Sequence, residues 1–191
     1  MIANFDAFEL LGLPQRLVLD EEELKAAYHQ RSSNLHPDQH PDQNVDGDFA
    51  RLVQAKQILA SPGKRLQHLL ELRLGESAPD GRGTLGAELM DRFGKVANCL
   101  SAADAVIGKR ERAQSALARA LTENEAAMAR EALERNQAEL RAEIGKQLEL
   151  FPKFDADGVE AHLTGAAECS RNLAFLEKWQ VQLKDRFAKL F

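Results

Sequence analysis

The sequence is poor in the features that mark secreted, metal-binding and membrane proteins. Its two cysteines, Cys99 and Cys169, lie far apart and belong to no C-x-x-C pair. Zinc binding, thiol–disulfide exchange and a disulfide framework are therefore not expected, and both cysteines are predicted to be small buried residues. No segment approaches the run of about 18 apolar residues that spans a membrane, and residues 1–8 lack the basic stretch of a signal peptide. We expect a cytoplasmic protein with no membrane partner.

The chain also lacks an excess of positive charge. Its 25 lysines and arginines are outnumbered by 30 aspartates and glutamates, which gives a net charge of -5. Because non-specific phosphate binding depends on positive charge, no nucleic-acid partner is expected. Runs in which valine, isoleucine or threonine alternates with polar residues are missing as well, so the sequence predicts no β-sheet.

The spacing of the apolar residues predicts an all-α protein, since they recur at steps of three and four. A first short helix is expected over about 5–11. It ends there because Gly12 can adopt a left-handed cap and Pro14 cannot continue a helix. Asp20, followed three residues later by Glu23, makes a capping box that begins a second helix.

The next helices are predicted to form an antiparallel hairpin. Pro37 disfavours helical structure in the residue before it, so the second helix is expected to end near 35–36 and a loop to follow as far as Gly47. The third helix ends before Ser61, a capping residue, and Pro62 stands at the first position of a fourth. The third helix is expected to bury Phe49, Leu52, Val53, Ile58 and Leu59.

A linker then separates two predicted domains. The stretch GESAPDGRGTLG at 75–86 contains four glycines and a proline among polar residues, a composition typical of linkers. We place the first domain at 1–75, the linker at 76–84 and a second helical domain at 85–191.

The second domain is predicted to be a three-helix antiparallel bundle. Thr122 and Glu125 form a capping box that is expected to begin its middle helix, and Pro152 marks the end of that helix. The last helix carries an apolar seam that is interrupted only by the polar Gln180, at Cys169, Leu173, Leu176, Gln180, Leu183, Phe187 and Leu190. The first helix carries a core stripe at Leu85, Leu89, Phe93, Val96, Leu100, Ala103 and Ile107.

The most specific motif is His36-Pro37-Asp38, because it lies directly after one amphipathic helix and before another of similar length. Tyr28 stands eight residues earlier, Gln54-Ala55 lies in the following helix, and Ser61-Pro62 closes that helix. With these features the segment 5–74 resembles a J-domain, an antiparallel helical hairpin with short flanking helices.

Longer phrases extend the resemblance toward both ends of the chain. They are FELLGLP at 8–14, LVLD at 17–20, ELM at 88–90 and RNLAFLEK at 171–178. Together they resemble the HscB family of iron-sulfur cluster co-chaperones. The weakest match is the stretch 103–120, where the chain is longer than the family pattern.

The resemblance implies an adaptor that catalyses no reaction and holds no cofactor. Its J-domain would stimulate ATP hydrolysis by a DnaK-class, HscA-like chaperone, and its C-terminal bundle would deliver an iron-sulfur cluster scaffold protein. The implied chaperone-binding residues are His36, Pro37 and Asp38, with Lys25, His29, Arg31 and Arg51 as further candidates. A second triplet, His40-Pro41-Asp42, does not directly follow the helix, and its role is open. The chaperone paralogue is also open.

Two departures from the family pattern affect the partners. The second helix carries few basic residues, so electrostatic steering toward an acidic chaperone surface is expected to be modest. The positions that match the client-binding patch are Leu89, Met90, Phe93 and Phe175. Leu89 and Phe93 also lie on the core stripe, whereas Met90 and Phe175 lie off the helix seams and are expected to form an exposed patch.

Acidic residues accompany this patch in the family, but here Gly94, Ala97 and Ser101 take their places. A J-domain co-chaperone for a different client therefore remains an alternative. The patch also leaves open whether the chain is a monomer or a weak homodimer. A third interpretation, from a different class, is an enzyme that uses His36, Asp38 and His40 for metal or acid–base chemistry.

Overall fold

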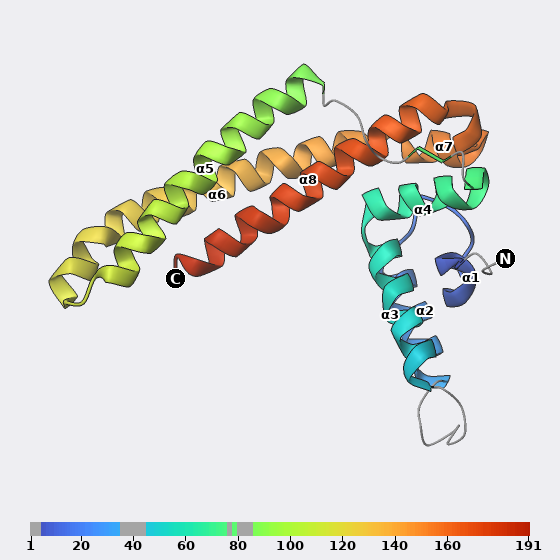
Figure 1. Cartoon of the computed structure of the whole chain (residues 1–191), viewed down its shortest axis with the longest axis horizontal. Helices are drawn as coiled ribbons and strands as arrows, with labels where there is room; N and C mark the ends of the chain where they lie inside the picture. Colours follow the sequence, from blue (N-terminus) through green and yellow to red (C-terminus); the bar gives the residue numbers. More distant parts are fainter. Residues whose placement is uncertain (1–4, 35–44, 76–77, 80–85) are drawn as a thin grey trace. The chain divides into compact units, whose positions relative to one another are not determined.

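The structure is a computed structural model that describes residues 5–34, 45–75, 78–79 and 86–191 (Figure 1). The described residues contain helices and no strand, which confirms the all-α prediction. The helices are α1 (Ala7–Leu11), α2 (Glu21–Asn34), α3 (Val45–Ala60), α4 (Pro62–Leu74), α5 (Ala87–Arg112), α6 (Ala116–Leu148), α7 (Phe151–Asp157), the short 3-10 helix η2 (Val159–His162) and α8 (Leu163–Lys189). None of them is long and apolar enough to cross a membrane.

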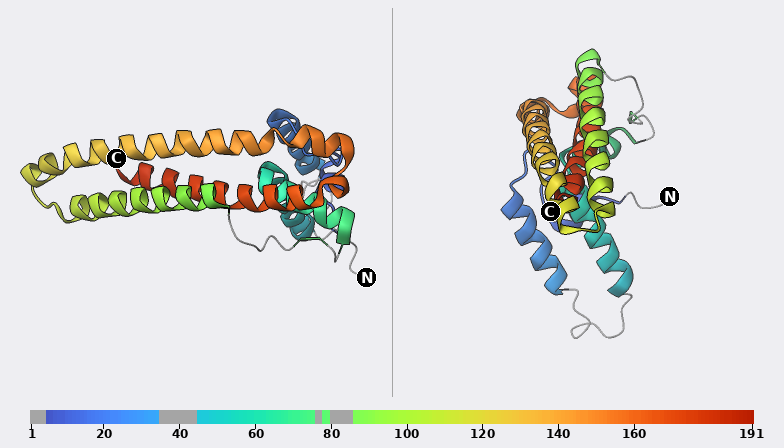
Figure 2. Two further views of the ribbon diagram at one scale, coloured as in Figure 1. Left: turned by 90° about the horizontal axis from the view of Figure 1, so that it is seen from above. Right: turned by 90° about the vertical axis from the view of Figure 1, so that its left-hand side faces the viewer.

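The chain divides into two compact units. Unit 1 comprises residues 1–82 and 148–171, and unit 2 comprises 83–147 and 172–191. The hairpin of α2 and α3 belongs to unit 1, whereas α5 and most of α6 belong to unit 2 (Figures 1 and 2). Most of the predicted linker at 76–84 lies outside the described residues.

The helix ends in unit 1 are fixed by the capping residues that the sequence indicates. Gly12 takes the left-handed conformation, with φ of 70°, and ends α1. Asp20 Oδ1 accepts from the backbone N–H groups of Glu22 at 2.8 Å and Glu23 at 3.0 Å at the start of α2. Ser61 Oγ accepts from the Lys64 N–H at 3.2 Å, and Pro62 begins α4.

The core of unit 1 lies where α1, α2 and α4 pack against α3. Its fully buried side chains include Phe8, Leu17, Leu52, Leu59, Leu66 and Leu70. The prediction that Phe49 points inward is wrong, because 44% of that residue is exposed. The buried stripe of α3 runs instead through Leu52, Ala55 and Leu59, from which Phe49 is turned away around the helix.

A segment from the C-terminal half of the chain completes unit 1. Asp155 in α7 accepts from the backbone N–H of Leu17 at 2.7 Å and of Val18 at 2.9 Å. The Ser170 hydroxyl donates to Gln67 Oε1 at 3.2 Å. The unit boundaries therefore differ from the predicted division, which assigned all of 85–191 to the second domain. Residues 148–171 belong to unit 1 because they bury Phe151, Phe154 and Val159 there.

Unit 2 is built around buried side chains that repeat every seven residues, the spacing of packed, nearly parallel or antiparallel helices. The seams are Leu89, Val96 and Ala103 in α5, Ala126, Leu133 and Leu140 in α6, and Leu176, Leu183 and Leu190 in α8. Trp179 is 4% exposed and joins this core, while the predicted seam residue Gln180 is only half-buried.

The hairpin of unit 2 turns earlier than predicted. Helix α5 continues past Gly108 to Arg112, and α6 begins at Ala116. The Ser115 hydroxyl accepts from the Ala118 N–H at 3.1 Å, as a capping residue does. Thr122 lies inside α6, so the prediction that it begins this helix is wrong.

Candidate functional site

The principal sequence motif lies outside the described residues. Both His36-Pro37-Asp38 and His40-Pro41-Asp42 fall in the segment 35–44, between the last residue of α2 and the first of α3. The flanking helices α2 and α3 contact each other within unit 1. The metal interpretation also rests on that segment, and the residues that the structure describes hold no group of three or more candidate metal ligands.

The basic candidates on α2 differ in how available their charge is. Lys25 Nζ donates to Glu22 at 2.8 Å and lies 3.1 Å from Glu21, and these carboxylates raise the pKa of Lys25. Its charge is therefore largely offset on the same helix. His29 and Arg31 are exposed, and the Arg31 guanidinium lies across Gly12.

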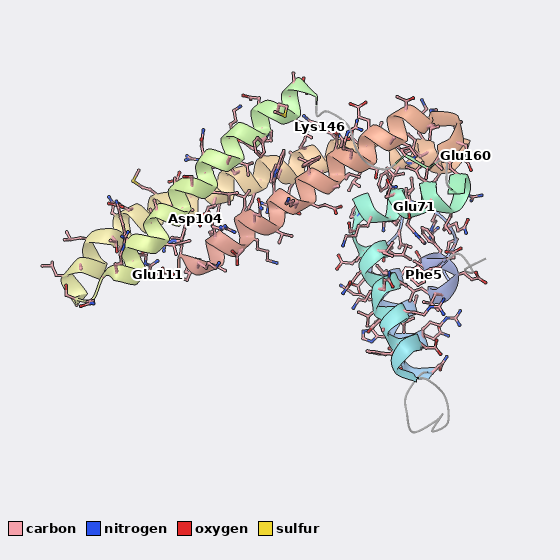
Figure 3. The ribbon with its side chains drawn as sticks, viewed as in Figure 1. Phe5, Glu71, Asp104, Glu111, Lys146 and Glu160 are labelled. Atoms are coloured by element: carbon pink, nitrogen blue, oxygen red, sulfur yellow. The ribbon has the colours of Figure 1, made fainter. Side chains whose placement is uncertain are left out.

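Arg51 on α3 lies over the Phe5 ring, 5.9 Å from its centre. This exposed cation–π contact orients the guanidinium while leaving its charge in place. Phe5 also lines a groove of about 510 Å³ with Gln54, Ile58, His68, Glu71, Leu72 and Gly75, and Figure 3 labels Phe5 and Glu71.

His68 is a buried core residue of unit 1 rather than a binding group. Its Nε2 accepts from the Ala7 N–H at 3.0 Å, and its ring stacks on Phe8 with centres 6.0 Å apart. Burial lowers the pKa of His68, although Asp6 and Glu71 act in the opposite direction. The neutral ring is the form that can accept the Ala7 hydrogen bond.

The four client-binding candidates lie in unit 2 and are exposed to different degrees. Leu89 is 7% exposed and belongs to the core, whereas Met90 is 52% exposed and Phe93 is 46% exposed. Phe175 is half-buried on α8. Two neighbouring turns of α5 thus present large apolar side chains to solvent.

The aromatic support beneath this patch is Trp179, which sequence reasoning did not include among the client-binding candidates. Trp179 lies 5.7 Å from Phe93 and 6.0 Å from Phe175 between ring centres. It therefore connects Phe93 on α5 with Phe175 on α8. The spacing of Phe175 and Trp179, one helical turn apart, was the available signal.

The surroundings of the patch carry balanced charge. Lys95 lies 2.8 Å from Asp91 and lowers the pKa of that carboxyl. An adjoining cavity of about 240 Å³ is lined by Leu89 and by the charged residues Glu88, Asp91, Arg92, Glu143 and Lys146, the last of which is labelled in Figure 3. Gly94, Ala97 and Ser101 are all exposed, so no charge is added along this side of α5.

Comparison with known proteins identifies a domain in the N-terminal part of the chain. Residues 6–68 match the DnaJ domain family model. The co-chaperone protein HscB homolog of Azoarcus sp. (strain BH72) is 32% identical over 91 residues, which cover 44% of this chain and 51% of that protein. The HscB homolog of Ralstonia nicotianae (strain ATCC BAA-1114 / GMI1000) is 39% identical over 72 residues, or 35% of this chain and 41% of that protein.

The fold comparison covers nearly the whole chain. The structure of chaperone HscB from Vibrio cholerae matches 97% of this chain and 99% of its own, with a TM-score of 0.64 and 20% identity. The fold and the DnaJ match define the chain as a J-domain protein. Within that class it is similar to HscB co-chaperones, in sequence over part of its length and in fold over nearly all of it. The chain spans about half the length of the HscB relatives that it matches in sequence.

Proposed function

We propose that this protein is a co-chaperone that stimulates ATP hydrolysis by a DnaK-class chaperone and delivers an iron-sulfur cluster scaffold protein to it. The observation that carries the proposal is the exposed pair Met90 and Phe93, which stand on the helical unit of a chain that also contains a DnaJ domain. ATP hydrolysis is then the chaperone's reaction, and this chain contributes no catalytic group.

The chaperone contact is assigned to His36, Pro37 and Asp38 with the basic residues nearby. Helix α2 contains two basic residues, Lys25 and Arg31, against three glutamates in its first turn, so the helix as a whole offers no excess positive charge. Among the described candidates, Arg31 and Arg51 are the more available cations, because Lys25 is held by Glu21 and Glu22. We therefore expect a contact that depends on the triplet more than on steering.

The client contact is assigned to Met90, Phe93 and Phe175, with Trp179 as their support. Large apolar and aromatic side chains that remain solvent-exposed on a helix are typical of protein-binding patches. Leu89 contributes by holding α5 in the core, because it is nearly fully buried. The aromatic contacts with Trp179 fix Phe93 and Phe175 before binding, which lowers the entropy lost in the complex.

A second candidate function is supported by a specific observation. The positions 94, 97 and 101 are exposed and uncharged, although acidic residues accompany the patch in the family that the sequence resembles. A partner that relies on those carboxylates would bind weakly here. A J-domain co-chaperone that serves a more apolar client is therefore the alternative.

The proposal is tested by steady-state ATP hydrolysis with DnaK-class chaperones from the same organism. The protein should increase the hydrolysis rate, and His36→Gln should abolish the increase. His40→Gln is the matched control, because it changes the same residue type four positions later in the second triplet. Loss with His40→Gln alone would assign the contact to the second triplet, and no stimulation of any chaperone would reject the J-domain role.

The client half has a separate test. Met90→Glu and Phe93→Glu should each weaken binding of a purified scaffold protein, measured by calorimetry, because a charge would enter the apolar patch. Val181→Glu is the control, since Val181 is 69% exposed elsewhere on unit 2. Normal chaperone stimulation without any scaffold binding would favour the alternative client.

A further inference from the structure

Helix α6 exposes a second apolar surface. It is separate from the patch of Met90, Phe93 and Phe175, called here the Met90 patch. Leu117, Leu121 and Met128 are 71%, 72% and 64% exposed. At about 100° per residue these three side chains lie within about 40° of one another around the helix. They point away from the seam of α6, because the buried Ala126 lies on the opposite side. We call Leu117, Leu121, Asn124 and Met128 the α6 stripe.

The first turns of α6 extend beyond the end of α8 within unit 2. Arg130 donates to the Leu190 carbonyl at 2.8 Å, and Arg110 donates to the same oxygen. These contacts place the end of α8 level with the two arginines. The remaining part of the α5–α6 hairpin continues past the end of α8 (Figures 1 and 2), and Figure 3 labels Glu111, which directly follows Arg110 in α5.

The acidic residues beside the stripe are already paired. Glu125 lies 2.7 Å from Lys109, and Glu123 lies 2.7 Å from Arg130 and 3.7 Å from Arg110. Their charges are therefore used to hold α5, α6 and the end of α8 together. A partner of the stripe meets an apolar surface with a charge-balanced border, which favours another apolar helix over a charged one.

The spacing of the stripe is self-complementary. Its members follow one another at steps of four, three and four residues, a palindromic pattern. When two copies of α6 pair in antiparallel fashion, Leu117 of one copy meets Met128 of the other, and Leu121 meets Asn124. The same register sets Glu125 against Ala120 and Glu123 against Thr122, so it brings no two acidic residues opposite each other.

We propose that the α6 stripe is a homodimer interface in which two copies of this chain pair antiparallel along α6. The twofold axis passes between Leu121 and Asn124. A contact made by four side chains from each copy is small, and small contacts belong to the class of interfaces that bury less than about 1,200 Å². The dimer is therefore weak and forms reversibly as the concentration rises, and it leaves the Met90 patch free for a client.

Sedimentation equilibrium of the full chain over a wide concentration range tests this interface. The wild-type protein should show a monomer–dimer equilibrium. Leu117→Glu and Met128→Lys should each raise the dimer dissociation constant by about tenfold or more, because each places unpaired charges in an apolar contact. Val181→Glu, an equally exposed change on α8, should leave the equilibrium unchanged.

The combined Leu117→Glu and Met128→Lys variant tests the register. Antiparallel pairing brings the two changed positions of opposite copies together, so the double variant should regain dimerisation. Within one helix these positions lie about 16 Å apart and cannot pair. A monomer at all concentrations, a dimer unaffected by the single changes, or a double variant that stays dissociated would each overturn the proposal. Circular dichroism confirms that every variant remains helical.

Discussion

The Asp155 carboxylate accepts hydrogen bonds from the backbone N–H groups of both Leu17 and Val18, so a residue of α7 caps the loop between α1 and α2. The two bonds join segments that are 138 and 137 residues apart in sequence. Leu17 itself is fully buried. The first unit is consequently closed by a part of the chain that follows the whole α5–α6 hairpin.

Removing this carboxylate should destabilise the protein. Asp155→Ala leaves both N–H groups without their acceptor and is expected to cost about 1–2 kcal/mol of the free energy of unfolding. Asp155→Asn keeps one acceptor oxygen and should cost less. Urea denaturation followed by circular dichroism measures both. Glu149→Ala is the control, and an equal loss in the control would show that the capping contact contributes nothing.

Two glycines should respond to alanine in opposite directions. Gly12 has φ of 70°, and a Cβ there would lie 2.7 Å from Arg31 Nη2, so Gly12→Ala should destabilise the protein by about 1–2 kcal/mol and displace the guanidinium. Gly145 is helical, and the methyl group of an alanine there would meet no neighbouring atom within 4 Å, so Gly145→Ala should stabilise the protein by about 0.5–1 kcal/mol. Thermal denaturation distinguishes a stabilising from a destabilising change, and a stabilising Gly12→Ala would contradict this expectation.

Stability should fall in mild acid because of His68. Burial lowers its pKa in the folded state below the ordinary value of 6.5. Above that value both states hold a neutral ring and the contribution is complete, whereas below it the unfolded state gains a proton that the folded state resists. The denaturation midpoint should therefore decrease as the pH is lowered from 7 to 5. His68→Gln, which keeps an acceptor but does not titrate, should flatten this dependence, and an unchanged slope would exclude His68 as its source.

The two cysteines should react with thiol reagents at different rates. Burial raises the pKa of Cys169 to about 12 and leaves it 1% exposed, so the folded protein should present almost no thiolate there. Cys99 is half-buried and its pKa is raised as well. Alkylation followed by mass spectrometry should modify Cys99 first. Faster modification of Cys169 would indicate that unit 1 opens readily.

Local sequence patterns predicted the helix ends of unit 1. They did not predict the contacts between segments that are distant in sequence. Asp20 and Ser61 cap their helices as expected because a capping bond spans only a few residues. Thr122 has the same capping pattern, but Ser115 begins α6 earlier, and the interior of a helix tolerates threonine. The assignment of 148–171 to unit 1 depends on Asp155 meeting a loop far away in sequence, which no local pattern encodes.

The candidate client-binding patch shows the same difference between what local patterns predict and what contacts with distant segments decide. Periodicity placed Met90 off the seam, and it is exposed, whereas Leu89 and Phe93 shared one stripe and only Leu89 is buried. The difference arises because Trp179 fills the seam beside Phe93, and the size of a side chain from another helix is not visible in the period of α5. The segment 35–44, with both His-Pro-Asp triplets, lies outside the described residues.

The adaptor role is tested most directly by ATP hydrolysis measured with the chaperone, this protein and a scaffold protein together. The account predicts that protein and scaffold stimulate hydrolysis more than the sum of their separate effects. Phe93→Glu should remove that excess while preserving the stimulation by the protein alone, and His36→Gln should remove both. Purely additive rates with the wild-type protein would contradict the account, because they would show that client binding and chaperone activation are not coupled.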